Sequence, residues 1–244
     1  MNTPNKKQSN VHCDSCSLHG LCLPKGLNEN ELSDLDDFIE RPHLLVSDAF
    51  VYKPKQKLKN LYAVRSGSVK TYLLDKNGGE QIIGFHLPGE VFGIDGMETK
   101  EHKCFAQTLE ETSICELPYD KLTQIVEQVP RMQDQIFSVM SQEMNNDQSH
   151  LLLLGRQNSE EKLATFLLSL SSRFEQRGFS ASKFNLSMSR QDIACFLGLT
   201  IETVSRLFRA FQNKGILAVD RRNISILDQK ELVKLVEDCD SNSA

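Results

Sequence analysis

The sequence of 244 residues contains no long apolar run. Its first residues include no apolar stretch of the kind that directs export, and no window approaches the ~20 apolar residues of a membrane span. The aliphatic run Leu151–Leu154 is far too short for either role. These absences argue against membrane and export classes, so we expect a cytoplasmic protein with no membrane partner.

Catalytic patterns are also absent. No nucleophile–base pair and no glycine-rich phosphate loop stands out, so we expect no catalytic residue and no enzyme. The composition, with 39% hydrophobic and 25% charged residues, is that of an ordinary globular chain. Its length suits two domains at the usual size of about 100–200 residues each.

A group of thiols near the start of the chain is the first positive signal. Seven cysteines, an odd number, without an export signal indicate a reducing compartment and metal or redox use. Three of them, Cys13, Cys16 and Cys22, have C-x2-C-x5-C spacing and follow the polar segment 2–10, for which we expect disorder. Three such thiolates can surround one metal centre and need a fourth ligand. Spacing alone does not separate an iron–sulfur cluster from structural zinc, and a disulfide with a spare thiol is the non-metal alternative.

Cys115 is the leading candidate for the fourth ligand. It lies in the strand-like segment 113–117, where a lone buried cysteine is usually a small hydrophobic residue. Cys104 competes for the role, but its position belongs to the nucleotide-pocket pattern described next. Cys195 and Cys239 lie in helical patterns, and we interpret them as core and tail residues.

Between about residues 44 and 117, short apolar runs alternate with glycine-containing turns. Such spacing, roughly every 8–12 residues, indicates an antiparallel barrel or sandwich. The stretches 62–70 and 88–93 resemble the β-roll of the cyclic-nucleotide-binding superfamily. Its nucleotide-binding members hold the ribose with a glutamate and the phosphate with an Arg-Ser pair, where this chain has Ile94 and Lys103-Cys104. We therefore expect no cyclic nucleotide and a pocket filled by side chains.

A long helix is predicted from Pro130 to Leu154, where glycine is absent. Apolar residues, joined by one aspartate, recur along this helix at steps of three or four. Such a stripe is typical of self-association or of packing on the chain's own core. The predicted dimerisation stripe consists of Ile136, Met140, Met144, Asp147, Leu151 and Leu154. Asp147 on such a seam would repel its copy and keep assembly near balance, or it lies off the seam in solvent.

The most specific local pattern is a helix–turn–helix in residues 188–208. Ser189 predicts the cap of a short helix, Gly198 a tight turn, and Thr200 the cap of a second helix. Because this pattern places the second helix in the major groove of DNA, we expect double-stranded DNA as a partner.

Three residues near the start of the second helix share one face and are the candidate DNA-reading residues: Glu202, Ser205 and Arg206. Arg206 can donate to guanine, and Glu202 can accept from the amino group of cytosine. An exposed Glu–Arg ion pair is the alternative. Residues 156–222 carry eleven Lys or Arg against six Asp or Glu, on a chain of net charge −5. Within them, residues 215–226 predict a β-hairpin wing with a basic tip for the phosphate backbone.

The order of cysteine loop, β-roll, long helix and winged helix–turn–helix resembles the fumarate and nitrate reduction regulators (FNR), the oxygen-sensing branch of the catabolite-activator superfamily. Motifs at 105–107, 173–180 and 199–206 carry this resemblance over nearly the whole chain. The expected fold class is α+β. We expect a cluster-ligating segment, a β-roll, a dimerisation helix and a DNA-binding domain, spanning residues 1–27, 28–125, 126–158 and 159–244.

The resemblance implies an oxygen-responsive global transcription regulator. The four cysteines would hold one oxygen-labile [4Fe-4S] cluster that favours the homodimer, and oxygen would release monomers. The dimer would read a palindrome of the TTGAT-N4-ATCAA type through Glu202, Ser205 and Arg206. It would activate or repress anaerobic-respiration genes by contacting RNA polymerase, in part through the turn Leu74–Gly79. Two alternatives stay open, namely a zinc-stabilised constitutive dimeric repressor and a small-ligand or haem-sensing regulator of the same superfamily.

Overall fold

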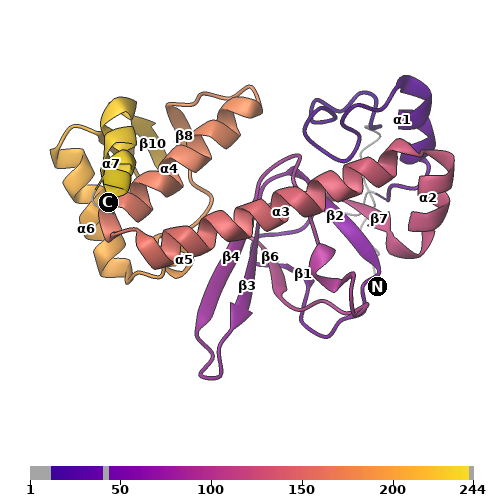
Figure 1. The fold of residues 1–244 in the computed structure, drawn as a ribbon, viewed down its shortest axis with the longest axis horizontal. Helices are drawn as coiled ribbons and strands as arrows, with labels where there is room; N and C mark the ends of the chain where they lie inside the picture. Colours follow the sequence, from indigo (N-terminus) through magenta and orange to yellow (C-terminus); the bar gives the residue numbers. More distant parts are fainter. Residues whose placement is uncertain (1–11, 41–43, 242–244) are drawn as a thin grey trace, which may run out of the picture. The chain divides into compact units, whose positions relative to one another are not determined.

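The computed structural model describes residues 12–40 and 44–241, and its backbone divides into two compact units (Figure 1). The first unit holds the described residues up to Leu73 together with Ile83–Asn145. The second holds Leu74–Ile82 together with the described residues from Asn146 onward. The segment 2–10, predicted to be disordered, lies outside the described residues, as does the side chain of Cys239.

Turns and one short helix open the first unit. Backbone hydrogen bonds close these turns, for example from the Cys22 N–H to the Leu18 carbonyl at 3.1 Å. Helix α1 (Glu29–Asp36) then begins at Asn28, whose side chain accepts the Glu31 N–H while the Glu31 carboxylate accepts the Asn28 N–H. This reciprocal cap satisfies two backbone donors that the first helical turn leaves unpaired.

A β-roll follows the short helix. Its strands are β1 (Phe50–Tyr52), β2 (Asn60–Ser66), β3 (Val69–Leu74), β4 (Glu80–His86), β5 (Val91–Phe92), β6 (Phe105–Thr108) and β7 (Ser113–Pro118). One sheet has the order β1-β6-β3-β4, and the other has the order β5-β2-β7. The β1–β6, β3–β6, β2–β5 and β2–β7 pairs are antiparallel. The antiparallel architecture expected from the glycine-punctuated runs is confirmed.

Aromatic side chains occupy the interior of the β-roll. The rings of Tyr62 and Phe92 stack with centroids 5.3 Å apart, and His102 stacks on Tyr52 at 3.6 Å. Cys104, which the sequence resemblance places in the nucleotide-pocket pattern, is buried in the same cluster. Side chains therefore fill this interior, as the sequence predicts.

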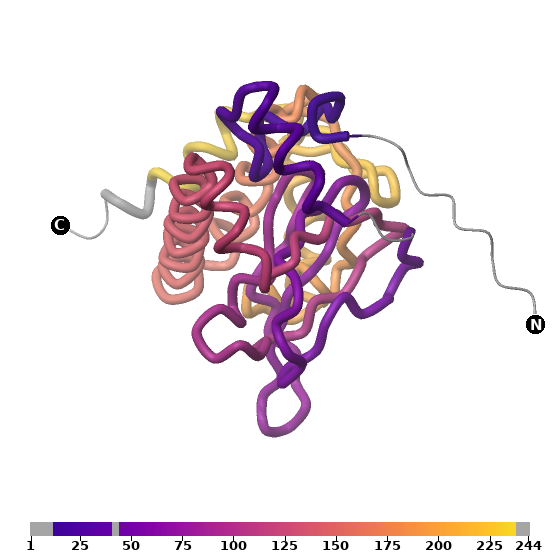
Figure 2. The backbone as a smooth tube through the Cα atoms, turned by 90° about the vertical axis from the view of Figure 1, so that its right-hand side faces the viewer, coloured from indigo at the N-terminus to yellow at the C-terminus, as the bar shows by residue number. Residues whose placement is uncertain are grey.

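A second core of the first unit joins the N-terminal turns to the long helix. After the β-roll come η2 (Tyr119–Lys121), α2 (Leu122–Gln128) and α3 (Arg131–Arg156). Leu23, the residue after Cys22, is buried in one cluster with Leu35 of α1 and with Met132 and Ile136 from the start of α3. Both Figure 1 and Figure 2 show α1 beside α2. The cysteine loop and the start of α3 thus share a hydrophobic core.

The second unit contains the predicted helix–turn–helix and its wing. Its elements are α4 (Ser159–Gln176), β8 (Lys183–Asn185), α5 (Arg190–Leu197), α6 (Ile201–Asn213), β9 (Leu217–Asp220), β10 (Asn223–Ile226) and α7 (Gln229–Ser241). The three strands form one sheet in the order β8-β10-β9. Asn223 pairs with Asp220, so Arg221 and Arg222 form the exposed tip of the wing.

The α+β class and the succession of cysteine loop, β-roll, long helix and winged helix–turn–helix are confirmed. Of the helices in the described ranges, none combines the length and the apolar character needed to cross a membrane.

Candidate metal centre and nucleic-acid interface

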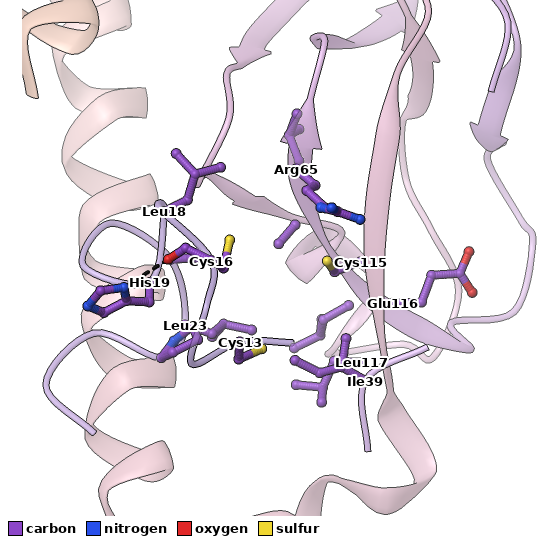
Figure 3. Close-up of a pocket in the computed structure, with 15 residues that line it drawn as sticks. Cys13, Cys16, Leu18, His19, Leu23, Ile39, Arg65, Cys115, Glu116 and Leu117 are labelled. Atoms are coloured by element: carbon purple, nitrogen blue, oxygen red, sulfur yellow. Dashed lines mark hydrogen bonds between the residues drawn. The ribbon is translucent and has the colours of Figure 1, made fainter. Parts of the chain in front are cut away.

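Four thiols from two distant segments line one pocket of the first unit (Figure 3). Cys13, Cys16 and Cys22 come from the N-terminal turns, and Cys115 comes from β7. The empty space inside, counting the part open to solvent, is about 510 Å3. The structure thus brings together the four cysteines that the sequence singles out as metal ligands, and Cys104 does not line this pocket.

The remaining lining of the thiol pocket is mostly aliphatic. It consists of Leu18, His19, Leu23, Pro24, Ile39, Leu61, Ala63, Val64, Arg65, Glu116 and Leu117. Cys115 lies opposite Ala63 in the β2–β7 ladder, and the small side chain of Ala63 leaves room beside the thiol.

Asp36, at the end of α1, holds the N-terminal side of the cysteine loop. Its Oδ1 accepts the Cys13 N–H at 2.8 Å, and its Oδ2 lies 2.5 Å from Nδ1 of His12. The Asp36 side chain is only 11% exposed, so these contacts fix the backbone of the first candidate ligand. Sequence reasoning missed Asp36, because no spacing rule links a carboxylate to a partner 23 residues away.

Burial in the thiol pocket disfavours a thiolate that has no metal partner. Burial raises the pKa of the Cys22 thiol to about 12, an increase that the Leu23 N–H opposes and that Cys115 and Cys16 enlarge. At neutral pH this thiol is therefore protonated, and a protonated thiol is a poor nucleophile. A metal centre supplies the positive charge that makes such a thiol a thiolate ligand.

The donor set fits a thiolate-ligated metal group. None of the six cysteines whose side chains the structure describes forms a disulfide. Four soft sulfur donors in an aliphatic pocket suit iron–sulfur clusters and zinc alike. Within residues 12–40 and 44–241, no three His, Cys, Asp or Glu side chains are gathered at the distances of a single bound metal ion.

The helix–turn–helix is fixed by local caps. Ser189 Oγ accepts the Asp192 N–H at 3.1 Å and begins α5, and Thr200 Oγ1 accepts the Thr203 N–H at 3.2 Å and begins α6. Between the helices Gly198 adopts φ 62°, a left-handed conformation that glycine tolerates best. The predicted caps and turn residue are all confirmed.

One face of α6 is buried and the other is exposed. Val204, Leu207, Phe208 and Phe211 pack into the core of the second unit. The exposed face carries the three candidate DNA-reading residues and one further arginine: Glu202, Ser205, Arg206 and Arg209. Arg209 was missed, although its spacing of three residues from Arg206 already placed it on this face.

An exposed apolar stripe runs along α3. Phe137, Met140, Met144 and Leu151 are exposed, and Asp147 is exposed on the same line of heptad spacing. Ile136 is only 9% exposed and belongs to the core of the first unit. The stripe therefore begins one residue later than the sequence pattern placed it, at Phe137, and it ends at the half-buried Leu154.

Two family models match the two halves of the chain. A Crp-like helix-turn-helix domain matches residues 161–235, and a cyclic nucleotide-binding domain matches residues 44–129. The second match concerns the β-roll, whose interior is filled by the aromatic cluster around Tyr52 and Tyr62.

Curated relatives match nearly the whole chain. The transcriptional activator protein Anr of Pseudomonas protegens is 44% identical over 94% of this chain and 94% of its own length. The fumarate and nitrate reduction regulatory protein of Vibrio cholerae is 45% identical over 92% of this chain and 90% of its own length. Among solved structures, FixK2 of Bradyrhizobium japonicum is 31% identical and covers 81% of this chain and 96% of its own, with a TM-score of 0.73. The chain therefore belongs to the CRP/FNR family of DNA-binding transcription regulators and is not an enzyme.

Proposed function

We propose that this protein is an oxygen-responsive transcription regulator of the cytoplasm that ligates a [4Fe-4S] cluster through Cys13, Cys16, Cys22 and Cys115. Without oxygen it forms a homodimer, binds a palindromic site of the TTGAT-N4-ATCAA type, and activates or represses anaerobic-respiration genes through RNA polymerase. The observation that carries this proposal is that these four thiols line one largely aliphatic pocket. The names of the Anr and fumarate and nitrate reduction relatives support it.

The bound cluster would supply a group that dioxygen oxidises. Its ligation would order the N-terminal turns and, through them, the start of α3. Ligation would tie the N-terminal turns to β7 at Cys115. Leu23 follows the ligand Cys22 and lies in one buried cluster with Met132 of α3, so a fixed loop would stabilise the first turns of this helix. The exposed stripe on α3 begins at Phe137, directly after these first turns. A well-ordered start of α3 would therefore favour pairing of the stripe with a second copy.

The stripe on α3 is the proposed dimer seam, made by Phe137, Met140, Met144, Asp147, Leu151 and Leu154. Apolar residues at heptad spacing associate because pairing removes them from water. Asp147 opposes this association, because each carboxylate would approach its copy across the seam. The two effects keep the dimer close to balance, so that ligation at the thiol pocket decides the outcome.

The exposed face of α6 is the proposed reading surface. Arg206 donates to guanine O6 and N7, Glu202 accepts from a cytosine amino group, and Ser205 allows close approach. In the dimer the two copies of α6 would lie about 34 Å apart, one turn of DNA, which explains a palindromic site. The wing tip at Arg221 and Arg222 would contact phosphates and set the position of the helix.

The turn between β3 and β4 is a proposed contact for RNA polymerase. Asp75 Oδ1 accepts the N–H groups of Asn77 and Gly79 at 2.7 and 2.8 Å, so this exposed turn has a fixed shape.

We also propose that the chain has four functional segments, a cluster-ligating segment, a β-roll, a dimerisation helix and a DNA-binding domain. They span residues 1–27, 28–125, 126–158 and 159–244.

Anaerobic purification tests this function. We expect a coloured protein with about four irons and four sulfides per chain that bleaches in air and loses dimer and palindrome binding together. A colourless zinc protein that binds the palindrome equally with and without oxygen would establish the constitutive repressor instead. A protein that binds DNA only with haem or a small ligand would establish the third alternative.

A further inference from the structure

Arg65 enters the wall of the thiol pocket at an irregularity of β2. Val64 pairs with Ile114 and Ser66 pairs with Ser113, so Arg65 is an extra residue in β2 relative to β7. Such a β-bulge re-aims a side chain and is frequent beside functional sites. Arg65 lines the thiol pocket, and Figure 3 draws it on the Cys115 side of that pocket.

Arg65 is the permanently cationic side chain in an otherwise largely aliphatic lining. The acidic member, Glu116, is directed away from the sulfur atoms in Figure 3, and its Oε2 accepts a hydrogen bond from Asn60 Nδ2 at 2.6 Å. A charge acts more strongly in such an apolar setting than in water. A guanidinium is also weakly hydrated, so it suits a half-buried position.

We propose that Arg65 is the charge-compensating residue of the thiol pocket and sets how readily the bound metal group is oxidised. This inference rests on the proposed function. Four thiolates bring four negative charges to the pocket, and the guanidinium beside Cys115 stabilises them. Loss of an electron from a bound iron group to dioxygen would make the site less negative, and this stabilisation would shrink. Arg65 therefore opposes oxidation and slows the response to oxygen.

The test compares R65Q, R65K and the wild-type chain after anaerobic reconstitution with iron and sulfide. R65Q removes the charge but keeps a polar side chain, whereas R65K keeps the charge. K59Q is the matched control, because it removes one positive charge from an exposed lysine directly before β2 that does not line the pocket. The readouts are iron per chain, reduction potential, the rate of bleaching in air, and the melting temperature of the metal-free protein.

We expect R65Q to hold about as much iron as the wild type and to bleach roughly tenfold faster, the order expected from removing one nearby unit charge. Its reduction potential should be more negative. R65K should lie closer to the wild type, and K59Q should match the wild type.

Two results would overturn the role of Arg65. One is an R65Q protein whose potential and bleaching rate equal those of the wild type. The other is an R65Q protein without iron whose metal-free form also melts well below the wild type, which would assign Arg65 to the fold alone. A wild-type chain that takes up no iron would instead overturn the proposed function.

Discussion

The position of the cysteine loop depends on contacts of single side chains that the spacing of its cysteines does not reveal. Asp36 is the clearest case, because its carboxylate joins α1 to His12 and to the backbone of Cys13. Each such hydrogen bond contributes about 1 kcal/mol. A loop built from turns depends on this anchor to present Cys13 to the pocket.

Asp36→Ala should therefore weaken retention of the metal group while leaving the β-roll folded. We expect the iron content after desalting to fall to about half or less, while Asp36→Asn, which keeps one acceptor oxygen, retains more. Asp34→Ala removes an exposed carboxylate from the same helix and should behave as the wild type. Equal iron in the Asp36→Ala and Asp34→Ala proteins would refute the anchoring role.

Asp95 has a comparable role inside the β-roll. Burial alone would raise the pKa of Asp95, but hydrogen bonds from His102 and from the Lys103 N–H outweigh burial and lower this pKa. The folded state thus binds the Asp95 proton less tightly than the unfolded state does. Its contribution to stability is present above the ordinary carboxyl pKa, near 3.8, and is lost as the pH falls below that value.

Asp95→Ala should lower the free energy of unfolding by about 2–3 kcal/mol at neutral pH, because it leaves the buried His102 Nδ1 without its acceptor. The free energy of unfolding of the variant should also fall less than that of the wild type as the pH is lowered, because Asp95 no longer contributes to that fall. Urea unfolding at neutral pH and again below pH 4 measures both effects. Glu98→Ala, at an exposed neighbouring position, is the control. A loss of stability that is the same at both pH values would contradict the assignment.

At the scale of elements, features set by local chemistry were predictable. The caps at Ser189 and Thr200 and the turn at Gly198 depend on a few neighbouring residues, and all were found where the sequence places them. The stripe on α3 is different, because the rotation of a helix depends on which face its own core takes. Ile136 and Phe137 are both apolar, but Ile136 lies in the buried cluster that also holds Met132, whereas Phe137 is exposed.

Substitutions in α6 and in the wing should weaken DNA binding in different ways. Arg206→Ala should cost about 1–3 kcal/mol per half-site and relax the preference at one base pair. Arg221→Ala should weaken binding to specific and unrelated DNA alike and reduce the salt dependence of binding by about one ion per chain. Fluorescence anisotropy with the palindrome, a single-base variant and random DNA at several salt concentrations separates the two. Loss of base preference in Arg221→Ala would contradict the assignment of the wing to phosphates.

At the scale of the whole molecule, the proposed function makes activity depend on whether one chain pairs with a second copy. The candidate ligands were predictable from spacing and resemblance, but the residues that support them, Asp36 and Arg65, come from distant segments and become visible only in the fold. For the same reason the sequence indicates a dimer stripe but not how strongly it associates.

Asp147→Ala should shift the balance toward the dimer. Removing the repelling carboxylates should leave a protein that is dimeric and binds the palindrome in air, with a dimer dissociation constant at least several-fold lower than that of the wild type. Sedimentation analysis with and without oxygen measures this constant. Asp134→Ala, at an exposed position on α3 off the stripe, is the control. An aerobic Asp147→Ala protein that stays monomeric would contradict the proposed seam.

The turns before α1 have a consequence for how oxygen is registered. Turn hydrogen bonds, the Asp36 carboxylate and the buried Leu23 hold this segment. Such a segment opens at a much smaller free energy than the sheets do. If the proposed function holds, the chain needs no separate transmitting part, because metal ligation and folding of this segment would be a single equilibrium. Oxygen would then be registered as partial unfolding, and the exchange rates of the amide hydrogens from Cys13 to Leu23 would report it.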